Sequence, residues 1–402
     1  MTRRKLLFIT DAAPLPLDRG QRIRIRSLLA ACETVADVSL IAQRPEAAAD
    51  CRKIEAQFPR VIWIGDEPTP DGWSGVQRIA ETALASIGLP SPGKTAHYLP
   101  YMNALKAADP EGFDLIWAER PHIARLCAGF AGKTIIDLDD LEHLKIAHQL
   151  NIAKTLLCRI KHFYRYWLYR RVETLWSRRF LASVVCSEKD RAYLRRHGGG
   201  DAFVVPNGSD LATTAERQPG AEAAPLRLVF LGNLDYRPNG DALDYFVADI
   251  LPALVQARPE VQLDVIGPNL EGADAKKRPV NIRLRGFVDD LGAALMQYDM
   301  MVAPIRVGAG TKLKVLDALK VGLPVVATSV AAEGLKLTHG QDLWIADTAS
   351  DFIEGILRLK RDPELAEKMA ANAKRHVAEH FAWPDIEARL AQWLAQARPR
   401  RD

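Results

Sequence analysis

Residues 308–328, GAGTKLKVLDALKVGLPVVAT, place a glycine-rich loop, a helical pattern and a short apolar run in direct succession. The pattern predicts a helix capped by Thr311, followed by a buried strand. Lys312 and Lys314 fall in the first helical turn, where free N–H groups and the helix dipole favour anions. Two cations are unfavourable there unless a bound phosphate compensates them. The stretch therefore predicts either a diphosphate site or a surface helix with solvated lysines and a Lys314–Asp317 pair.

Short apolar runs alternate with helical stretches on both sides of this segment. In the N-terminal half the runs are KLLFIT (5–10), DVSLIA (37–42), RVIWIG (60–65), DLIWAE (114–119), TIIDLD (134–139) and ASVVCS (182–187). In the C-terminal half they are LRLVFLG (226–232), VQLDVIG (261–267), IRLRG (282–286), MMVAPI (300–305) and LPVVAT (323–328). Such runs are typical of strands buried on both faces, and the stretches between them suit crossover helices. The sequence therefore predicts an α/β protein with two doubly wound parallel sheets, one in each half.

A change of composition separates the two halves. Residues 206–225, PNGSDLATTAERQPGAEAAP, are rich in Pro, Gly, Ala and polar residues, which is typical of a linker. This linker predicts an N-terminal domain at 1–205 and a C-terminal domain at 226–382. The helix expected at 383–402 is predicted to pack back on the N-terminal domain. Two such domains would face each other across a ligand cleft.

The overall composition is that of a folded protein without a strong charge preference. The chain has 402 residues, 48% of them hydrophobic, and a formal net charge of +4. This charge is too small for the length to indicate a nucleic-acid partner. The five cysteines are widely spaced without a CxxC pair, so reduced thiols are expected. The short apolar run in MTRRKLLFIT predicts no signal peptide, and no run reaches the ~20 apolar residues of a membrane span, so we expect a cytoplasmic protein.

Glycines stand at four of the predicted strand ends in the C-terminal half. They are Gly232, Gly267 and Gly286, with Gly308 and Gly310 after the fourth strand. Because the carboxyl ends of parallel strands meet at one edge of a sheet, these glycines let the backbone approach a ligand there. They favour a nucleotide site beside the helix that carries the two lysines.

The order and spacing of further motifs resemble the retaining glycosyltransferases of family 4. The motifs are DAAPLPLDRGQRIR (11–24), VVPNGSD (204–210), LVFLGNLDYRPNGDAL (228–243), LDVIGPN (263–269), LRGFVDDL (284–291), the 308–328 segment and HFAW (380–383). Within that family the chain looks most like bacterial sugar transferases that build exopolysaccharides. The resemblance implies the GT-B fold, with two Rossmann-like domains, an acceptor in the first and a nucleotide-sugar donor in the second.

The resemblance also implies roles for residues of the C-terminal domain. The GFVDD turn, with Gly286, Phe287, Val288 and Asp290, would contact the base, and Asp317 would accept hydrogen bonds from the ribose hydroxyls. The full set of candidate donor-binding residues is Gly232, Asn233, Arg237, Gly267, Gly286, Phe287, Val288, Asp290, Arg306, Gly308, Gly310, Thr311 and Asp317. Lys312 and Lys314 are the candidate catalytic cations, which would stabilise the leaving diphosphate electrostatically.

Three positions depart from the family pattern. Asn233 and Asn239 stand where many members have an arginine and a lysine for the diphosphate, and Ala309 replaces a glutamate that contacts the sugar. The resemblance implies that the positive charge moves to Lys312 and Lys314, with Arg237 or Arg306 in support. If it does not, the chain is a transferase-like protein without activity.

In the N-terminal domain the candidate residues are fewer. Asp18, Gly20 and Arg22 lie in the loop before the first expected helix, which the resemblance makes an acceptor and phosphate loop. His122, just after a strand, is the histidine expected near the sugar and is the third catalytic candidate. A capping or surface role for His122 is an equal alternative.

The acidic run Asp137, Asp139 and Asp140 raises the possibility of a divalent cation. The run lies far in sequence from the donor motifs, and the resemblance implies no metal and no cofactor besides a UDP- or GDP-linked sugar as substrate. A helix N-cap or a polar lining role is therefore preferred for these residues.

Residues 154–179, KTLLCRIKHFYRYWLYRRVETLWSRR, combine basic residues with aromatic rings. One interpretation is a helix that lies on an anionic membrane surface, which would suit a lipid-linked acceptor and a peripheral location at the inner face of the cytoplasmic membrane. The other is a helix that packs its apolar residues on the first sheet and exposes only its basic face. That packing face would consist of Leu157, Ile160, Tyr164, Trp167 and Leu175. The sequence leaves both interpretations open.

The leading functional hypothesis is a metal-independent hexosyltransferase that moves a sugar from a nucleotide-sugar to a lipid-linked or polysaccharide acceptor, in cell-envelope or exopolysaccharide synthesis. One alternative is a non-catalytic binding subunit of a polysaccharide assembly complex. Another is a nucleotide-sugar epimerase, which would turn over without an acceptor.

Overall fold

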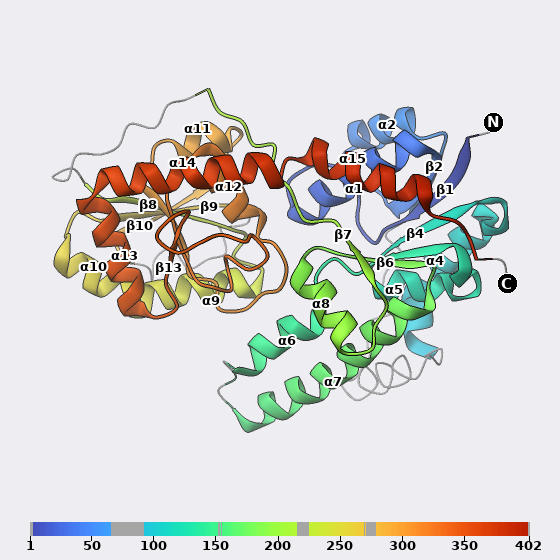
Figure 1. The fold of residues 1–402 in the computed structure, drawn as a ribbon, viewed down its shortest axis with the longest axis horizontal. Coiled ribbons are helices and arrows are strands. Elements are labelled where there is room, and N and C mark those ends of the chain that lie inside the picture. Colours follow the sequence, from blue (N-terminus) through green and yellow to red (C-terminus); the bar gives the residue numbers. More distant parts are fainter. Residues whose placement is uncertain are drawn as a thin grey trace. The chain divides into compact units, whose positions relative to one another are not determined.

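Two compact units make up the chain in the computed structural model (Figure 1). Unit 1 contains Met1–Pro206 and Pro384–Asp402, and unit 2 contains Asn207–Trp383. The structure describes residues 3–65, 92–151, 153, 155–214, 225–268, 270 and 279–400, with the backbone alone for 92–97 and 151. Half of the predicted linker, residues 215–224, lies outside the described residues.

Unit 1 is built on a seven-stranded parallel sheet of order β3-β2-β1-β4-β5-β6-β7. The strands are β1 (Arg4–Ile9), β2 (Ala36–Gln43), β3 (Arg60–Ile64), β4 (Leu115–Glu119), β5 (Thr134–Asp137), β6 (Ala182–Val185) and β7 (Ala202–Val204). The helices are α1 (Gly20–Val35), α2 (Ala48–Gln57), α4 (Pro92–Ala108), α5 (Pro121–Ala124), α6 (Glu142–Asn151), α7 (Leu156–Arg179), α8 (Glu188–Arg196) and α15 (Trp383–Gln396). The central strand β1 pairs Leu6 with Val38 of β2 and with Leu115 of β4, and all three side chains are buried.

Helix α15 is held on unit 1 although it follows unit 2 in the chain. The Arg4 guanidinium at the start of β1 donates to the carbonyl oxygens of Ala395 at 2.9 Å and of Ala397 at 2.9 Å. Trp393 of α15 stacks on Phe203 of β7 with ring centroids 4.6 Å apart. Strands from both ends of the unit 1 sequence thus contact the same helix.

Unit 2 contains a six-stranded parallel sheet of order β10-β9-β8-β11-β12-β13. The strands are β8 (Arg227–Leu231), β9 (Gln262–Ile266), β10 (Ile282–Gly286), β11 (Met300–Ala303), β12 (Val325–Ala327) and β13 (Trp344–Ile345). The helices are α9 (Arg237–Tyr245), which continues through a π-helical turn (Phe246–Ile250) into α10 (Leu251–Ala257), then α11 (Leu291–Leu295), α12 (Leu313–Val321), α13 (Ala349–Arg361) and α14 (Pro363–His380).

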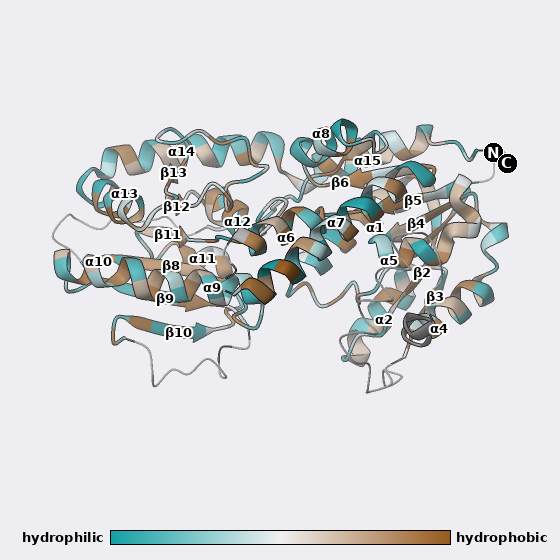
Figure 2. Cartoon of the chain, turned by 90° about the horizontal axis from the view of Figure 1, so that it is seen from below, coloured by the Kyte–Doolittle hydropathy of each residue, from teal (hydrophilic) through white to brown (hydrophobic). Residues whose placement is uncertain are grey.

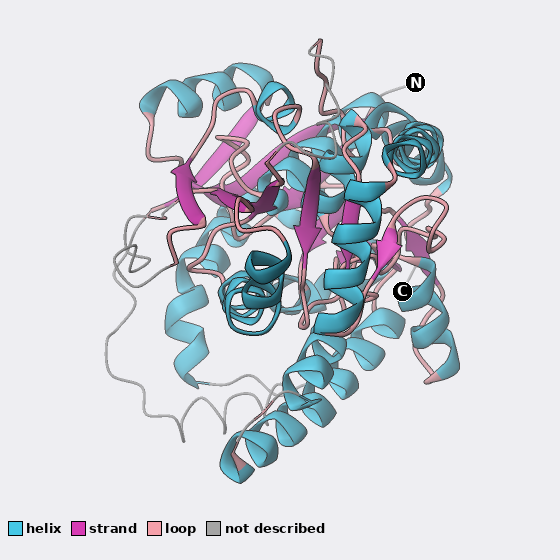
Figure 3. Ribbon diagram, turned by 90° about the vertical axis from the view of Figure 1, so that its left-hand side faces the viewer, coloured by secondary structure: helices cyan, strands magenta, loops and turns pink. Residues whose placement is uncertain are grey.

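The fold class predicted from the sequence is confirmed, because both sheets are parallel and wound with helices. Figure 3 shows helices on either side of the strands. All eleven apolar runs form strands. Strands β7 and β13, which have three and two residues, were not predicted. No described helix is long and apolar enough to cross a bilayer.

For helix α7, the interpretation that its apolar residues pack on the first sheet is wrong. Leu157, Ile160, Tyr164, Trp167 and Leu175 do not pack on the first sheet, because between 41% and 81% of each residue is exposed. The buried face of α7 instead carries His162, Leu168, Glu173, Trp176 and Ser177. Lys154, at the start of the predicted segment, lies outside the described residues.

Candidate functional site

In unit 2, the strands β8 and β9 are each followed by a glycine, and the backbones of these two glycines lie close together. The Gly232 N–H donates to the Ile266 carbonyl at 2.9 Å, and the Gly267 N–H donates to the Gly286 carbonyl at 3.0 Å. A Cβ on Gly267 would lie 2.4 Å from the Gly232 carbonyl oxygen. Gly267 is therefore required by close backbone packing at this edge of the sheet.

The Lys314 side chain reaches this same strand end from α12. Its Nζ donates a hydrogen bond of 2.6 Å to Oδ1 of Asn239 and lies 5.1 Å from the centroid of the Phe230 ring. A Cβ on Gly232 would lie 2.7 Å from this Nζ. Gly232 therefore leaves space for the Lys314 ammonium. Asn239 stands where many members of the resembled family have a lysine, and here its side-chain oxygen holds the Lys314 ammonium in place.

The electrostatic state of Lys314 is unusual for a lysine. Burial, followed by the positive charge of Lys312, lowers the pKa of the Lys314 ammonium to about 7. Lys312 folds back over its own loop and donates to the carbonyl oxygens of Ala309 at 2.7 Å and Gly310 at 2.6 Å. No carboxylate partner of Lys314 occurs among the described residues, and the positive charge of Lys312 makes the protonated form of Lys314 less favourable.

The predicted helix cap at Thr311 is wrong. Helix α12 begins at Leu313, with Lys312 as the preceding residue and no capping side chain. Thr311 is buried, and its hydroxyl oxygen accepts a hydrogen bond of 3.2 Å from the Asn207 N–H. The hydroxyl is used by Asn207, and the first N–H groups of α12 have no side-chain cap.

Asp317 lies one turn further along α12 and does not pair with Lys314. Its Oδ1 accepts a hydrogen bond of 2.6 Å from the Ser209 hydroxyl. Burial raises the pKa of Asp317 to about 6, although the Ser209 bond acts in the opposite direction. A half-buried carboxylate and a half-buried ammonium that do not neutralise each other are typical of a ligand site.

Among the other candidate donor residues, some are hydrogen-bonded within unit 2 and others are exposed. Arg306 makes two hydrogen bonds to the Asp241 carboxylate, at 2.7 and 3.1 Å, and lies 4.5 Å from the Tyr245 ring centroid. Its charge is therefore already compensated. Arg237 is exposed at the start of α9, and Asn233 caps its own turn by accepting from the Asp235 N–H at 2.9 Å.

The GFVDD turn follows β10. Gly286 has a φ of 75°, a left-handed conformation that favours glycine, and Phe287 is 62% exposed. Asp290 accepts a hydrogen bond of 2.8 Å from the Ala293 N–H and so caps α11, while Val288 is half-buried beside it. An exposed aromatic ring on this turn is available to stack on a base.

In unit 1, His122 lies in a cluster that sequence reasoning found only in part. Its Nε2 is 2.7 Å from Oδ2 of Asp11, which follows β1. The Gln21 amide donates to both Asp11, at 2.9 Å, and Glu119, at 3.0 Å. Glu119, which also accepts from Thr10, has its pKa raised to about 8, chiefly by burial. The sequence feature that could have predicted this cluster is a carboxylate at the end of each of two apolar runs, Asp11 in KLLFITD and Glu119 in DLIWAE.

The predicted acceptor loop lies before α1. Asp18 accepts a hydrogen bond of 3.0 Å from Arg22, and Gly20 is exposed at the first position of the helix. The Asp18–Arg22 pair is partly exposed and fixes the loop to the helix that follows it.

The acidic run after β5 is mostly structural. The buried Arg24 guanidinium donates to Asp137 at 3.0 and 3.3 Å and to the Val205 carbonyl at 2.8 Å. Asp139 lies 3.3 Å from the same guanidinium. Sequence reasoning did not recognise Arg24 as the partner of this run.

Asp139, Asp140 and Cys186 have their ligand atoms within 4.8 Å of one another. However, the Cys186 thiol donates to Asp140 at 3.1 Å, and burial raises its pKa well above the ordinary value. In this arrangement the thiol hydrogen bond is satisfied by the Asp140 carboxylate.

The family comparison matches a segment of unit 2. Residues 225–362, which include Lys312, Lys314 and Asp317, match the family model of the glycosyl transferases group 1. The phosphatidyl-myo-inositol mannosyltransferase of Mycobacterium tuberculosis is 29% identical over 226 residues, which are 53% of this chain and 58% of that protein. The chain spans between 42% and 59% of the length of the curated relatives that it matches.

The solved structures match the chain over nearly its whole length. Sucrose-phosphate synthase from Thermosynechococcus elongatus has a TM-score of 0.71 at 17% identity and covers 98% of this chain and 99% of its own. HepE of Anabaena, in complex with UDP and glucose, has a TM-score of 0.66 at 15% identity and covers 98% of this chain and 100% of its own. These likenesses show the fold, which is that of GT-B proteins with two Rossmann-like domains.

Proposed function

We propose that the protein is a glycosyltransferase that moves a sugar from a nucleotide-sugar to a lipid-linked or polysaccharide acceptor, with retention of anomeric configuration. The family match over 225–362 supports sugar transfer. The mannosyltransferase among the relatives, and the UDP and glucose bound to HepE, support a nucleotide-sugar donor and a glycan product. The location is the cytoplasm, on a cell-envelope or exopolysaccharide pathway.

The observation that carries this proposal is the Lys314 ammonium. It is half-buried, its pKa is lowered to about 7, and Lys312 is the cation beside it. A protein maintains such a group at a free-energy cost, because charge in low dielectric is unfavourable without a counter-ion. The diphosphate of a nucleotide-sugar supplies that counter-ion, and the uncapped N–H groups of α12 add donors for the same oxygens.

The chemistry required of these residues is electrostatic. The bond between the anomeric carbon and the donor diphosphate breaks, and the acceptor hydroxyl attacks the same face while its proton passes to a donor phosphate oxygen. Lys312 and Lys314 stabilise the negative charge that develops on the diphosphate. Asp317 accepts hydrogen bonds from the ribose, and the Phe287 turn contacts the base. His122, oriented by Asp11, binds the sugar. This mechanism uses no cofactor or metal.

One alternative retains support from a specific residue. Ala309 is buried where the family carries a sugar-contacting glutamate, which favours a non-catalytic binding subunit. Such a subunit would bind nucleotide weakly and would not transfer sugar. An epimerase would convert the donor in the absence of any acceptor.

The test is a thermal-shift series with UDP, GDP, ADP and their common sugar conjugates, with and without EDTA. A ligand that binds only the folded state at 100 times its Kd adds ~2.7 kcal/mol to the free energy of unfolding. An EDTA-insensitive shift with one nucleotide supports the proposal and identifies the base. The absence of any shift would favour the binding subunit, and donor conversion without acceptor would favour the epimerase.

A further inference from the structure

Helix α7 exposes a continuous stripe of large apolar side chains, which we call the apolar stripe. Its members are Leu156 (73% exposed), Leu157 (81%), Ile160 (57%), Phe163 (56%), Tyr164 (41%) and Trp167 (50%). Their spacing of three and four residues places them on one face of the helix. Figure 2 colours several segments of α7 as hydrophobic, with hydrophilic segments between them. A soluble surface rarely exposes so many large apolar neighbours without a partner.

Cations border the apolar stripe on both sides. Between residues 156 and 171 the sequence contains Arg159, Lys161, Arg165, Arg170 and Arg171 but no Asp or Glu. At 3.6 residues per turn, Arg159 and Arg170 fall on one side of the stripe and Lys161 and Arg165 on the other, while Arg171 borders its C-terminal end, one turn beyond Trp167. Arg159, Lys161 and Arg171 are exposed. The face that α7 presents is therefore apolar along its centre and positive along its edges.

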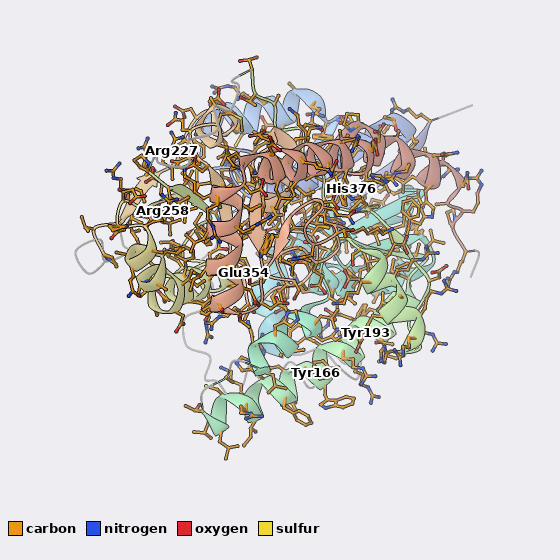
Figure 4. All side chains as sticks on the ribbon, turned by 60° about the vertical axis from the view of Figure 1, so that its left-hand side comes forward. Tyr166, Tyr193, Arg227, Arg258, Glu354 and His376 are labelled. Atoms are coloured by element: carbon orange, nitrogen blue, oxygen red, sulfur yellow. The ribbon has the colours of Figure 1, made fainter. Side chains whose placement is uncertain are left out.

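The fold does not need this face for its own packing. The Glu173 carboxylate, on the opposite side of α7, accepts hydrogen bonds from His143 and from the Glu142 N–H, the latter at 2.7 Å. Tyr166 of α7 lies 3.3 Å from Tyr193 of α8 between their hydroxyl oxygens, and both rings are labelled in Figure 4. Figures 1 and 3, at right angles, both show α6 and α7 projecting from the lower end of unit 1.

We propose that the apolar stripe and its bordering cations bind the surface of an anionic phospholipid bilayer. The leucines and Ile160 would enter the acyl boundary, the rings of Phe163, Tyr164 and Trp167 would lie at headgroup depth, and the cations would contact lipid phosphates. α7 lies in the plane of the surface and does not span it. This binding requires no donor nucleotide, so it can be tested independently of sugar transfer.

The charge pattern decides between a bilayer and a second copy of this chain. A symmetric dimer through α7 would bring the five cations of one copy against the five of the other, which is unfavourable. An anionic bilayer instead complements the cations of the stripe, of which Arg165 also lies 3.9 Å from the Glu142 carboxylate. Each Lys or Arg near such a surface contributes about fivefold to the partition coefficient, so three of them contribute roughly a hundredfold.

The experiment is co-sedimentation of the full chain with extruded vesicles of phosphatidylglycerol and phosphatidylethanolamine, compared with vesicles of phosphatidylcholine. We expect binding to the anionic vesicles only. Arg159→Gln/Lys161→Gln/Arg171→Gln should lower the partition coefficient roughly a hundredfold, as should Leu157→Ser/Ile160→Ser/Phe163→Ser. Because these side chains are exposed, both variants should unfold at the wild-type temperature. Lys314→Met should bind the vesicles as the wild type does.

Matched controls make the result specific to α7. Arg52→Gln/Lys106→Gln/Lys368→Gln removes the same charge from exposed positions elsewhere, and Val280→Ser removes an apolar side chain that is 91% exposed. Both controls should bind anionic vesicles normally. Equal loss in the charge control, equal binding to phosphatidylcholine, or normal binding by both α7 variants would overturn the proposal. So would a wild-type dimer in sedimentation velocity that the Leu157→Ser/Ile160→Ser/Phe163→Ser variant converts to a monomer without any vesicle binding.

Discussion

Lys314 Nζ and Asn239 Oδ1 are 2.6 Å apart, so an amide accepts the hydrogen bond of a cation that has no carboxylate partner among the described residues. The amide fixes the position of the ammonium without neutralising it. Gly232 leaves the space in which both groups meet. A positioned but uncompensated cation has consequences for stability, for pH dependence and for catalysis.

Replacing Lys314 should stabilise the protein and abolish nucleotide binding. The folded protein releases the Lys314 proton near pH 7, whereas the unfolded chain keeps it up to about its ordinary pKa of 10.5. The group therefore destabilises the fold below pH 7, and this cost disappears as the pH rises from 7 to 10.5. Lys314→Met should raise the free energy of unfolding of unit 2 at pH 6 by roughly 1–3 kcal/mol, after allowance for partial exposure.

Urea unfolding at pH 6 and pH 9.5 measures this effect. The gain in Lys314→Met should be smaller at pH 9.5 than at pH 6. Lys320→Met, at the other end of α12, is the matched control and should show no such gain. A loss of stability in Lys314→Met at pH 6 would show that the ammonium is already compensated in the free protein.

Nucleoside diphosphate affinity should fall as the pH rises above 7. Bound diphosphate favours the protonated form of Lys314, and that form becomes scarce in the free protein above its pKa of about 7. The dissociation constant should rise by up to ~10-fold per pH unit between pH 7.5 and 9.5, where the second ionisation of the phosphate, near pH 6, is complete. Isothermal titration calorimetry measures it. Lys314→Arg should give a flatter profile because a guanidinium keeps its proton.

Lys312→Ala should lower turnover by ~10²-fold or more, because it removes charge that stabilises the leaving diphosphate. Its Nζ is held by two carbonyl oxygens of the preceding loop, so the charge is positioned before substrate binds. Steady-state kinetics with the donor identified by thermal shift, together with the nucleotide Kd, separates turnover from binding. A near-normal rate in a folded variant would exclude Lys312 from the chemistry.

Arg24→Met should destabilise unit 1 by ~3–5 kcal/mol, because it leaves the buried Asp137 carboxylate without its ion-pair partner. Arg24→Met/Asp137→Leu should recover most of that loss. Arg26→Met, which removes a partly exposed arginine 3.9 Å from Glu33, should cost less than ~1 kcal/mol. Urea unfolding followed through unit 1 tests all three, and an equal loss in the single and double variants would contradict the ion-pair explanation.

The sequence predicted the sheets well because buried parallel strands are continuous apolar runs. It missed β7 and β13 because three and two residues are too short to form such a run. It predicted that α7 is a helix but left its exposed face open, because helical periodicity shows that apolar residues share a face without showing what covers that face. The buried Arg24 was not singled out, because its partner Asp137 is 113 positions away in the sequence and is brought to it only by β5.

The sequence indicates Lys312 and Lys314 as candidate site residues, but it does not indicate the contacts that position them. Lys312 and Lys314 were identified because cations are out of place at a helix N-terminus. The Asn239–Lys314 bond joins residues 75 positions apart, and the Thr311–Asn207 bond joins residues 104 positions apart. Local pattern contains no information on such pairs, so Thr311 was wrongly predicted as a cap.

The attachment of α15 to β1 and β7 also sets the order in which the chain can fold on the ribosome. Residues 207–383 form a continuous unit that can fold as soon as it is synthesised, whereas unit 1 is made in two pieces separated by all of them. The main-chain carbonyls that accept the hydrogen bonds of Arg4, and the ring that stacks on Phe203, are translated after all of unit 2. Unit 1 therefore begins before unit 2 and is completed after it, and a nascent chain that stops within residues 207–383 leaves the Arg4 guanidinium and the Phe203 ring without these partners.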